Sequence, residues 1–156
     1  MTDIGQVFQT SQLASLTESG KEEIDKEKES ILIVEDNREL RFFLRTIFAQ
    51  YFNVIEAENG KAGLEKSKSY QPDIIVSDVM MPEMDGIEMV RALREEMTTS
   101  HIPIVLLTAK SNIESKIEGM ELGADDYITK PFSAAYLKAR IFNLLEQRKK
   151  LQALYC

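Results

Sequence analysis

Short apolar runs alternate with segments of helical periodicity along most of this chain. The first run, ILIV at residues 31–34, ends directly in two acids, which is typical of a strand buried on both faces of a sheet. The same reading applied along the chain predicts five strands, at residues 31–34, 53–57, 73–77, 102–109 and 126–130.

Apolar residues at helical spacing lie between and after these runs, and they predict five helices. The first helix carries a stripe that we interpret as core, formed by Leu40, Phe43, Leu44, Ile47, Phe48 and Tyr51. The second is expected at residues 61–69, after a simple turn at Asn59-Gly60. The stripes of the other three are Ile87, Val90, Leu93 and Met97; Ile113, Ile117 and Met120; and Leu137, Ile141 and Leu144.

Polar residues at the expected helix ends support this assignment. Asp85 is placed to cap the third helix, and Ser111 with Glu114 forms a possible capping box for the fourth. Gly123 is expected to end the fourth helix, and Ser133 to open the last one.

Strands and helices that alternate through short loops predict an α/β fold, with a parallel sheet covered by helices on both faces. Right-handed crossovers leave few possible topologies. Folds of this class bind ligands at the carboxyl ends of the strands, near the point where strand order reverses.

Composition divides the chain into three parts. Residues 1–30 contain seven acids and three bases with few large apolar side chains, so we interpret them as an acidic linker or disordered leader. Residues 31–148 form the folded domain. Residues 149–156 extend the last helix or begin a linker: Leu151 and Tyr155 continue its stripe after three basic residues. Such an extension could serve as a signalling connector or a dimer seam.

Charge and residue usage exclude several classes of function. A net charge of −7 argues against direct binding of nucleic acid. No run is long enough to span a membrane and the start does not resemble a signal peptide, so we expect a cytoplasmic domain without membrane contact. The single cysteine, Cys156, fits a reducing compartment, and the single histidine, His101, is expected to be structural or exposed.

Charged and hydroxyl side chains lie at the carboxyl ends of four of the five strands. They are Glu35 and Asp36, Asp78, Thr108, and Lys130. The carboxyl ends of parallel strands meet at one edge, so three carboxylates would repel one another unless a cation joined them. Oxygen ligands without histidine or cysteine suit Mg²⁺. A carboxylate nucleophile beside Mg²⁺, a lysine and a hydroxyl is equipped for phosphoryl transfer, with Asp78 attacking the phosphorus.

The motifs LIVEDN, SDVMMPEMDG, LLTA and YITKPF occur in this order, with fifty-two positions from Asp78 to Lys130 (130 − 78). Together they closely resemble the receiver domain of bacterial two-component response regulators, over about residues 30–148. The resemblance implies a flavodoxin-like, doubly wound, three-layer αβα fold with strand order 2-1-3-4-5 and five helices. Many members carry Asp at the position of Glu35, which is a common variant.

The resemblance also implies roles for individual residues. Asp78 would be the phosphoacceptor, and Glu35, Asp36, Asp78 and the backbone carbonyl of Met80 would hold Mg²⁺. Thr108 and Lys130 would contact the phosphoryl group, and the Lys130-Pro131 peptide would be cis. On phosphorylation Thr108 would move toward the phosphoryl group and Tyr127 would turn inward, although Tyr127 reads equally well as a half-buried core residue.

These roles describe a phosphoacceptor signalling switch in a phosphorelay. It would take its phosphoryl group from a phosphohistidine on a sensor histidine kinase or phosphotransfer domain. It would catalyse its own phosphorylation and dephosphorylation, and change the surface of the fourth helix, fifth strand and fifth helix for a downstream output domain or partner. Homodimerisation on phosphorylation is a further expectation. Within the family, the TSHIPIVLLTAK segment is closest to receivers of hybrid histidine kinases.

Three other functions are compatible with an α/β fold of this kind. An Asp-nucleophile, Mg²⁺-dependent phosphohydrolase is the main alternative, but Met80 stands where such enzymes carry a second acid. A flavin carrier would need a phosphate loop where Glu35 and Asp36 would repel an anion. A phosphate-independent interaction module would not need the complete set of acids, threonine and lysine.

Overall fold

Five parallel strands form one central sheet in the order β2-β1-β3-β4-β5, which confirms the expected topology. The structure is a computed structural model that describes residues 24–25, 27–109 and 113–155. The strands are β1 (Glu29–Val34), β2 (Phe52–Ala57), β3 (Ile74–Asp78), β4 (Ile104–Ala109) and β5 (Asp126–Lys130). The helices are α3 (Arg38–Phe48), α4 (Gly60–Tyr70), α5 (Gly86–Glu95), α6 (Ile113–Leu122) and α7 (Ala134–Tyr155).

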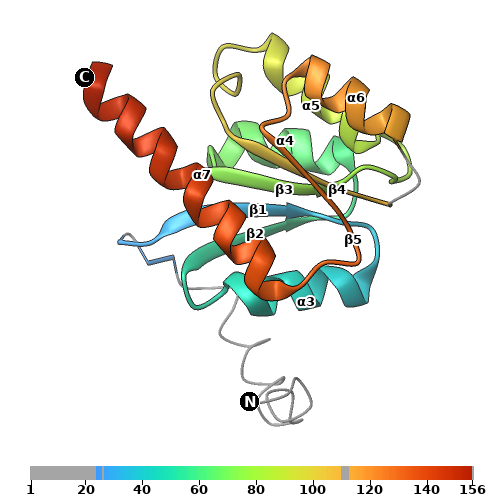
Figure 1. Cartoon of the computed structure of the whole chain (residues 1–156), viewed down its shortest axis with the longest axis horizontal. Helices are drawn as coiled ribbons and strands as arrows, with labels where there is room; N and C mark the ends of the chain where they lie inside the picture. Colours follow the sequence, from blue (N-terminus) through green and yellow to red (C-terminus); the bar gives the residue numbers. More distant parts are fainter. Residues whose placement is uncertain (1–23, 26, 110–112, 156) are drawn as a thin grey trace, which may run out of the picture.

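The helices cover both faces of the sheet and make the three-layer arrangement seen in Figure 1. Alternate residues of β1 point to opposite faces, because side chains of a strand alternate. Ile31 and Ile33 join a core with α3 and α7, whereas Leu32 and Val34 join a second core with α5. All four side chains are fully buried, which explains why the run is apolar without interruption.

The strand register brings the expected site residues to one edge. Val34 of β1 lies beside Ser77 of β3, so Glu35 follows next to Asp78. Asp78 in turn lies beside Leu107, and Ala109 lies beside Lys130. The carboxyl ends of β1, β3, β4 and β5 therefore meet where the sequence predicts them to meet.

Three of the expected helix ends are confirmed. Asp85 and Glu88 form a capping box at α5, with hydrogen bonds of 2.8 and 3.0 Å. The Ser133 hydroxyl accepts a hydrogen bond of 3.0 Å from the Tyr136 N–H at the start of α7. Gly123 has a φ of +111°, which favours glycine, directly after α6. The capping box expected at Ser111 lies outside the described residues.

Asn59-Gly60 was predicted to be a simple turn, and this is wrong. Asn59 is the N-cap of α4, where its side chain accepts a hydrogen bond of 2.8 Å from the Ala62 N–H. Gly60 begins the helix and donates a hydrogen bond of 2.9 Å to the Met84 carbonyl. A Cβ at Gly60 would lie 2.4 Å from that oxygen, so this close approach of two backbones requires glycine.

Two predicted stripes extend too far, and a third lies on the wrong face. Tyr51 and Met97 fall beyond the ends of α3 and α5, and Met97 is 92% exposed. Ile117 and Met120 of α6 are 55% and 46% exposed, whereas Gly119 of that helix is buried. The spacing of apolar residues did not show that the face of α6 with Gly119 is the face that packs against the sheet.

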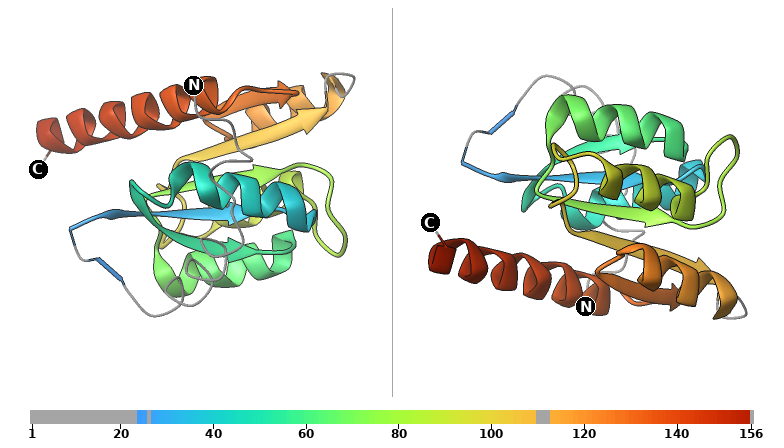
Figure 2. Two further views of the ribbon diagram at one scale, coloured as in Figure 1. Left: turned by 90° about the horizontal axis from the view of Figure 1, so that it is seen from below. Right: turned by 90° about the horizontal axis from the view of Figure 1, so that it is seen from above.

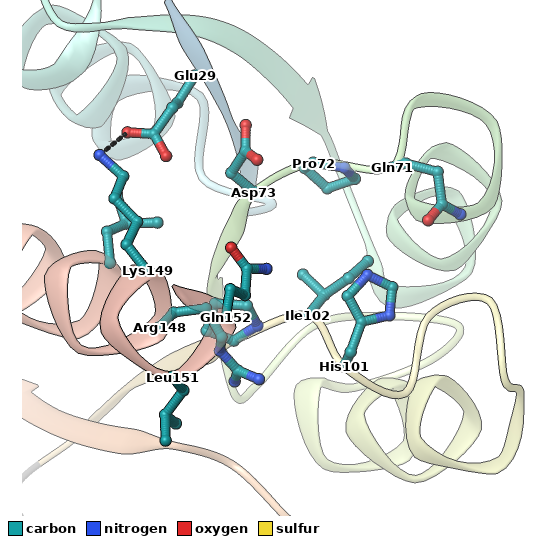
Figure 3. A pocket seen from close by; sticks show the side chains of 12 residues that line it. Glu29, Gln71, Pro72, Asp73, His101, Ile102, Arg148, Lys149, Leu151 and Gln152 are labelled. Atoms are coloured by element: carbon teal, nitrogen blue, oxygen red, sulfur yellow. Dashed lines mark ion pairs between the residues drawn. The ribbon is translucent and has the colours of Figure 1, made fainter. Parts of the chain in front are cut away.

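Helix α7 continues to residue 155 and projects past the sheet, as Figure 2 shows. Its final turns pass the amino-terminal ends of the strands, where Lys149 pairs with Glu29 at 3.2 Å. A pocket of about 470 Å³ lies there, lined in part by His101 and Arg148 (Figure 3). His101 is exposed, as expected, in the loop before the first residue of β4. Among the described helices, none has the length and apolar content needed to cross a membrane.

Candidate functional site

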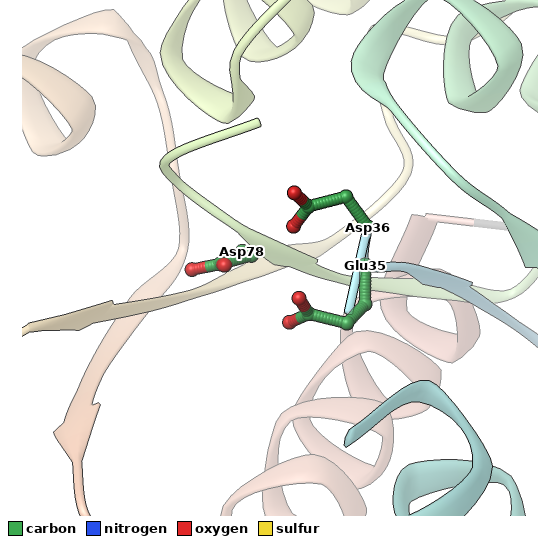
Figure 4. A group of neighbouring side chains, drawn as sticks. All are labelled: Glu35, Asp36 and Asp78. Carbon is green, nitrogen blue, oxygen red and sulfur yellow. The ribbon is translucent and has the colours of Figure 1, made fainter. Parts of the chain in front are cut away.

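Three carboxylates from two strand ends form one cluster. Glu35 and Asp36 follow β1 and Asp78 ends β3, and one oxygen of each lies within 4.8 Å of the others. Figure 4 shows all three side chains directed into the same space. Glu35 and Asp78 are 1% and 8% exposed, whereas Asp36 is open to solvent. The expected convergence of these acids is present.

Asp78 has one oxygen fixed and one left free. Its Oδ1 accepts a hydrogen bond of 2.9 Å from the Val79 N–H and lies 3.1 Å from Lys130 Nζ. Among the described residues, none donates a hydrogen bond to Oδ2. The carboxylate is therefore held in one orientation while an oxygen remains available for chemistry.

The start of α5 packs closely against the backbone of Asp78. The Gly86 N–H donates a hydrogen bond of 2.8 Å to the Val79 carbonyl. A Cβ at Gly86 would lie 2.4 Å from the Asp78 carbonyl oxygen, so only glycine permits this contact. The backbone that carries the Asp78 side chain is therefore held by the start of α5.

Lys130 reaches the cluster from β5 and joins two of its acids electrostatically. Its Nζ lies 3.1 Å from Asp78 Oδ1 and 3.9 Å from Glu35 Oε1. The peptide from Lys130 to Pro131 is cis, as the resemblance implies. Lys130 is therefore placed to offset negative charge added at Asp78.

The surroundings of Glu35 change the pKa of its carboxyl group. The pKa of Glu35 is raised to about 7: burial is the largest cause and the neighbouring Asp78 adds to it, while the Asn37 N–H and Lys130 act in the opposite direction. The Asn37 N–H donates to Oε2 at 3.0 Å, but Oε1 is buried and has no hydrogen-bond partner among the described residues. A buried carboxylate oxygen without a donor is a free ligand position.

This set of groups fits Mg²⁺. A hard divalent cation prefers carboxylate oxygens, and the cluster offers three such groups close together with one buried oxygen unsatisfied. Mutual repulsion of the acids would also fall when a cation bound. The Met80 carbonyl, which the resemblance assigns to the same ion, stays a prediction.

Thr108 and Tyr127 lie on the neighbouring strands β4 and β5. Thr108 is 2% exposed, and its hydroxyl makes only a long hydrogen bond of 3.5 Å to the Ala109 carbonyl. Tyr127 is 9% exposed, and its hydroxyl is buried without a hydrogen-bond partner among the described residues. The pKa of the Tyr127 phenol is raised to about 12, chiefly by burial, and the neighbouring Thr108 side chain acts in the opposite direction. The two hydroxyls are thus buried and only weakly held.

Arg41 is a contact of the site that the sequence reading missed. Its Nη1 donates a hydrogen bond of 2.6 Å to the Glu35 carbonyl, and its Nε pairs with Glu56 at 3.1 Å. The available signal was weak: two arginines four residues apart on α3, facing an acid in β2. That spacing is common on solvated helix faces and does not by itself indicate a contact with the site.

Comparisons with known proteins agree with this geometry. Residues 31–142 match the family model of the response regulator receiver domain. Histidine kinase P4 of Formosa agariphila is 46% identical over 154 residues, covering 97% of this chain and 11% of the kinase. Hybrid signal transduction histidine kinase D of Dictyostelium discoideum is 42% identical over 127 residues, covering 81% of this chain and 8% of that protein. The chain thus spans about a tenth of the length of these relatives.

Solved structures give the same result. The signal receiver domain of a signal transduction histidine kinase from Syntrophus aciditrophicus superposes with a TM-score of 0.72 at 35% identity, covering 76% of this chain and 91% of that one. The chemotaxis protein CheY4 of Vibrio cholerae gives 0.70 at 31% identity, covering 74% and 98%.

Proposed function

Because this chain belongs to the family of response regulator receiver domains, we propose that Asp78 is the residue that accepts a phosphoryl group. The family acts as a phosphoacceptor switch in two-component signalling. The free Oδ2 of Asp78, beside an oxygen already held by Val79 and Lys130, is the observation that carries the assignment.

The phosphoryl group comes from a phosphohistidine on a histidine kinase or phosphotransfer domain. An Asp78 oxygen forms a bond to phosphorus as the bond from phosphorus to the imidazole nitrogen breaks, and the electron pair leaves with the imidazole. Water later cleaves the new acyl phosphate, which releases inorganic phosphate and restores the carboxylate. The chain thereby catalyses its own phosphorylation and dephosphorylation.

Charge neutralisation accounts for the other groups of the site. Glu35, Asp36, Asp78 and the Met80 carbonyl would hold Mg²⁺, which would supply positive charge to the phosphoryl oxygens. Lys130 lies 3.1 Å from Asp78 Oδ1 and offers a second positive charge. The Thr108 hydroxyl, at the end of the adjacent strand, donates a hydrogen bond to the phosphoryl group.

Thr108 and Tyr127 transmit the change to the surface formed by α6, β5 and α7. The Thr108 hydroxyl is only weakly bonded, so it can turn to the phosphoryl group at little cost. Tyr127, packed beside it, then favours the inward position. Phosphorylation shifts the population toward that arrangement because it binds the phosphoryl group better.

The wider setting is also a proposal. Similarity to histidine kinases suggests that this receiver acts within or beside a hybrid kinase in the cytoplasm. Its partners are then the kinase or phosphotransfer domain and an output domain, and phosphorylation promotes a homodimer.

Phosphorylation by acetyl phosphate with Mg²⁺ tests the assignment. Intact-mass measurement is expected to show one added phosphoryl group on the wild type and none on Asp78→Asn. Glu83→Gln is a matched control, because Glu83 is an exposed acid of the same loop and lies outside the cluster. Normal labelling of Asp78→Asn, or no labelling of the wild type, would refute the proposal.

A further inference from the structure

The peptide that joins Glu35 to Asp36 is held by a side chain from outside the acid cluster. Its oxygen, the Glu35 carbonyl, accepts a hydrogen bond of 2.6 Å from Arg41 Nη1. The Glu35 N–H still pairs with the Ala57 carbonyl at 3.0 Å, but β2 ends at Ala57. The guanidinium thus supplies a donor at the point where the strand ladder stops.

Arg41 is itself held in place by β2. Glu56 accepts from Arg41 Nε at 3.1 Å and from Arg45 Nη1 at 2.7 Å, so one carboxylate anchors two arginines of α3. The Glu56 backbone carbonyl accepts a further hydrogen bond from Lys66 of α4. Only 13% of the Arg41 side chain is exposed. A planar guanidinium fixed on two sides is a rigid support for the carbonyl that it contacts.

This support acts on both metal-binding acids together. The plane of one peptide fixes the direction in which the chain leaves Glu35 and enters Asp36. On the other side, the Asn37 N–H holds Glu35 Oε2 at 3.0 Å and leaves Oε1 free. Arg41 and Asn37 therefore fix the turn from opposite ends.

We propose that Arg41 is a positioning residue for the divalent-cation site, which it preorganises by fixing the Glu35–Asp36 peptide. The proposal rests on the function proposed for the acid cluster and extends it to a residue that touches neither ion nor phosphoryl group. Groups that orient metal ligands from outside are worth about tenfold or more in metal affinity.

The sign of the effect separates positioning from simple charge. A nearby positive charge repels Mg²⁺, so removing it without other consequences strengthens Mg²⁺ binding. Loss of a positioning contact weakens Mg²⁺ binding instead, because the two acids must then be ordered on binding. Neutralising Arg41 thus gives opposite results under the two explanations.

Isothermal titration of the folded protein with Mg²⁺ measures this sign. Arg41→Gln is expected to raise the dissociation constant for Mg²⁺ about tenfold, and Arg41→Lys, which keeps the charge and one donor, by less. Arg45→Gln is the matched control: it removes the same charge one turn later and also loses a contact to Glu56, but it leaves the Arg41 contact to the Glu35 carbonyl in place. Its dissociation constant is expected to stay within about twofold of the wild type, or to fall.

The outcomes distinguish this inference from the proposed function. If the wild type binds Mg²⁺ and Arg41→Gln binds it equally well or more tightly, Arg41 has no positioning role. Equal weakening in Arg41→Gln and Arg45→Gln would also overturn the inference, because the Glu35 carbonyl contact would not be the cause. Should Arg41→Gln not fold, Arg41→Lys must show weaker binding for the inference to stand. Absence of Mg²⁺ binding by the wild type would instead refute the site itself.

Discussion

Glu35 shows how strongly a single residue of the site depends on its surroundings. It is 1% exposed and lies beside Asp78, yet one N–H and a lysine 3.9 Å away partly stabilise its charge. These effects bring the pKa of Glu35 to about 7, close to neutral pH, when no cation is bound. Protonation and a metal ion are then alternative ways to remove the same unfavourable charge.

Substitution of Glu35 by Gln is expected to change how stability depends on pH. The pKa is about 7 in the folded chain against an ordinary value of 4.5, so the folded state binds more protons between these pH values. The resulting stabilisation is complete below pH 4.5 and is lost as the pH rises to about 7. Without divalent cations, the free energy of unfolding of the wild type should fall relative to Glu35→Gln by up to about 3 kcal/mol.

Denaturant unfolding of both proteins across this range, with excess chelator, measures the difference. Glu39→Gln is the control, because Glu39 is an exposed acid of α3. Addition of Mg²⁺ is expected to reduce the difference, since the ion binds the charged form of Glu35. Parallel stability curves for the wild type and Glu35→Gln would contradict the prediction.

At the scale of elements, the strands were predicted well and the helix faces less so. All five strands were located to within two residues, because a strand buried on both faces shows as an unbroken apolar run. The α6 stripe was wrong, since Ile117 and Met120 are exposed and Gly119 packs inward. Glycine has no apolar side chain and does not count in a hydrophobic pattern. The pattern therefore cannot show that the Tyr127 ring packs against Gly119.

The candidate site likewise contains features that the sequence predicted and features that it did not. The convergence of the three acids with Lys130 was predicted because each lies at the carboxyl end of a strand, and parallel strands end on the same side of a sheet. The Arg41 contact and the close approaches at Gly60 and Gly86 were not predicted. These contacts depend on how helices pack against segments that are distant in the sequence. The local pattern of apolar and polar residues does not predict such packing.

Gly119→Ala is expected to disturb Tyr127 through helix α6. A Cβ at Gly119 would lie 2.9 Å from both Tyr127 Cε2 and Leu106 Cδ1. Alanine favours a helix by about 1 kcal/mol over glycine, but overpacking here should outweigh that gain and destabilise the fold by about 1–3 kcal/mol. Moving the ring outward should also lower the pKa of the Tyr127 phenol from about 12, because burial is what raises it.

Thermal unfolding and ultraviolet titration of the tyrosines measure these two effects. In a Tyr127→Ala background, Gly119→Ala should cost clearly less, because the ring edge is no longer there. If Gly119→Ala were more stable than the wild type and its tyrosines titrated as in the wild type, the prediction would be wrong. The Tyr127 ring would then have room to accept the added methyl group.

At the scale of the whole molecule, α7 runs from the carboxyl ends of the strands to their amino-terminal ends. It begins after Lys130-Pro131 at the acid cluster, and its last turns lie beside Glu29 and Asp125 at the opposite edge. The first half carries the packing: Leu137, Ile141 and Leu145 are buried in the core with α3. A shift of α7 at the end beside the acid cluster would therefore be carried along a continuous helix to the segment that projects beyond the sheet.

Shortening the chain separates the two halves of α7. In the final turns Leu151 and Leu154 are 51% and 77% exposed, and Lys149 pairs with Glu29 at the surface. Exposed ion pairs contribute about 1 kcal/mol or less, so a chain ending at Arg148 should lose no more than this in its free energy of unfolding. Leu145→Ala, which empties a buried position, should cost about 2–5 kcal/mol. Denaturant unfolding compares the two proteins, and a truncation as costly as Leu145→Ala would mean that the projecting turns are part of the folded core instead of a separate connecting segment.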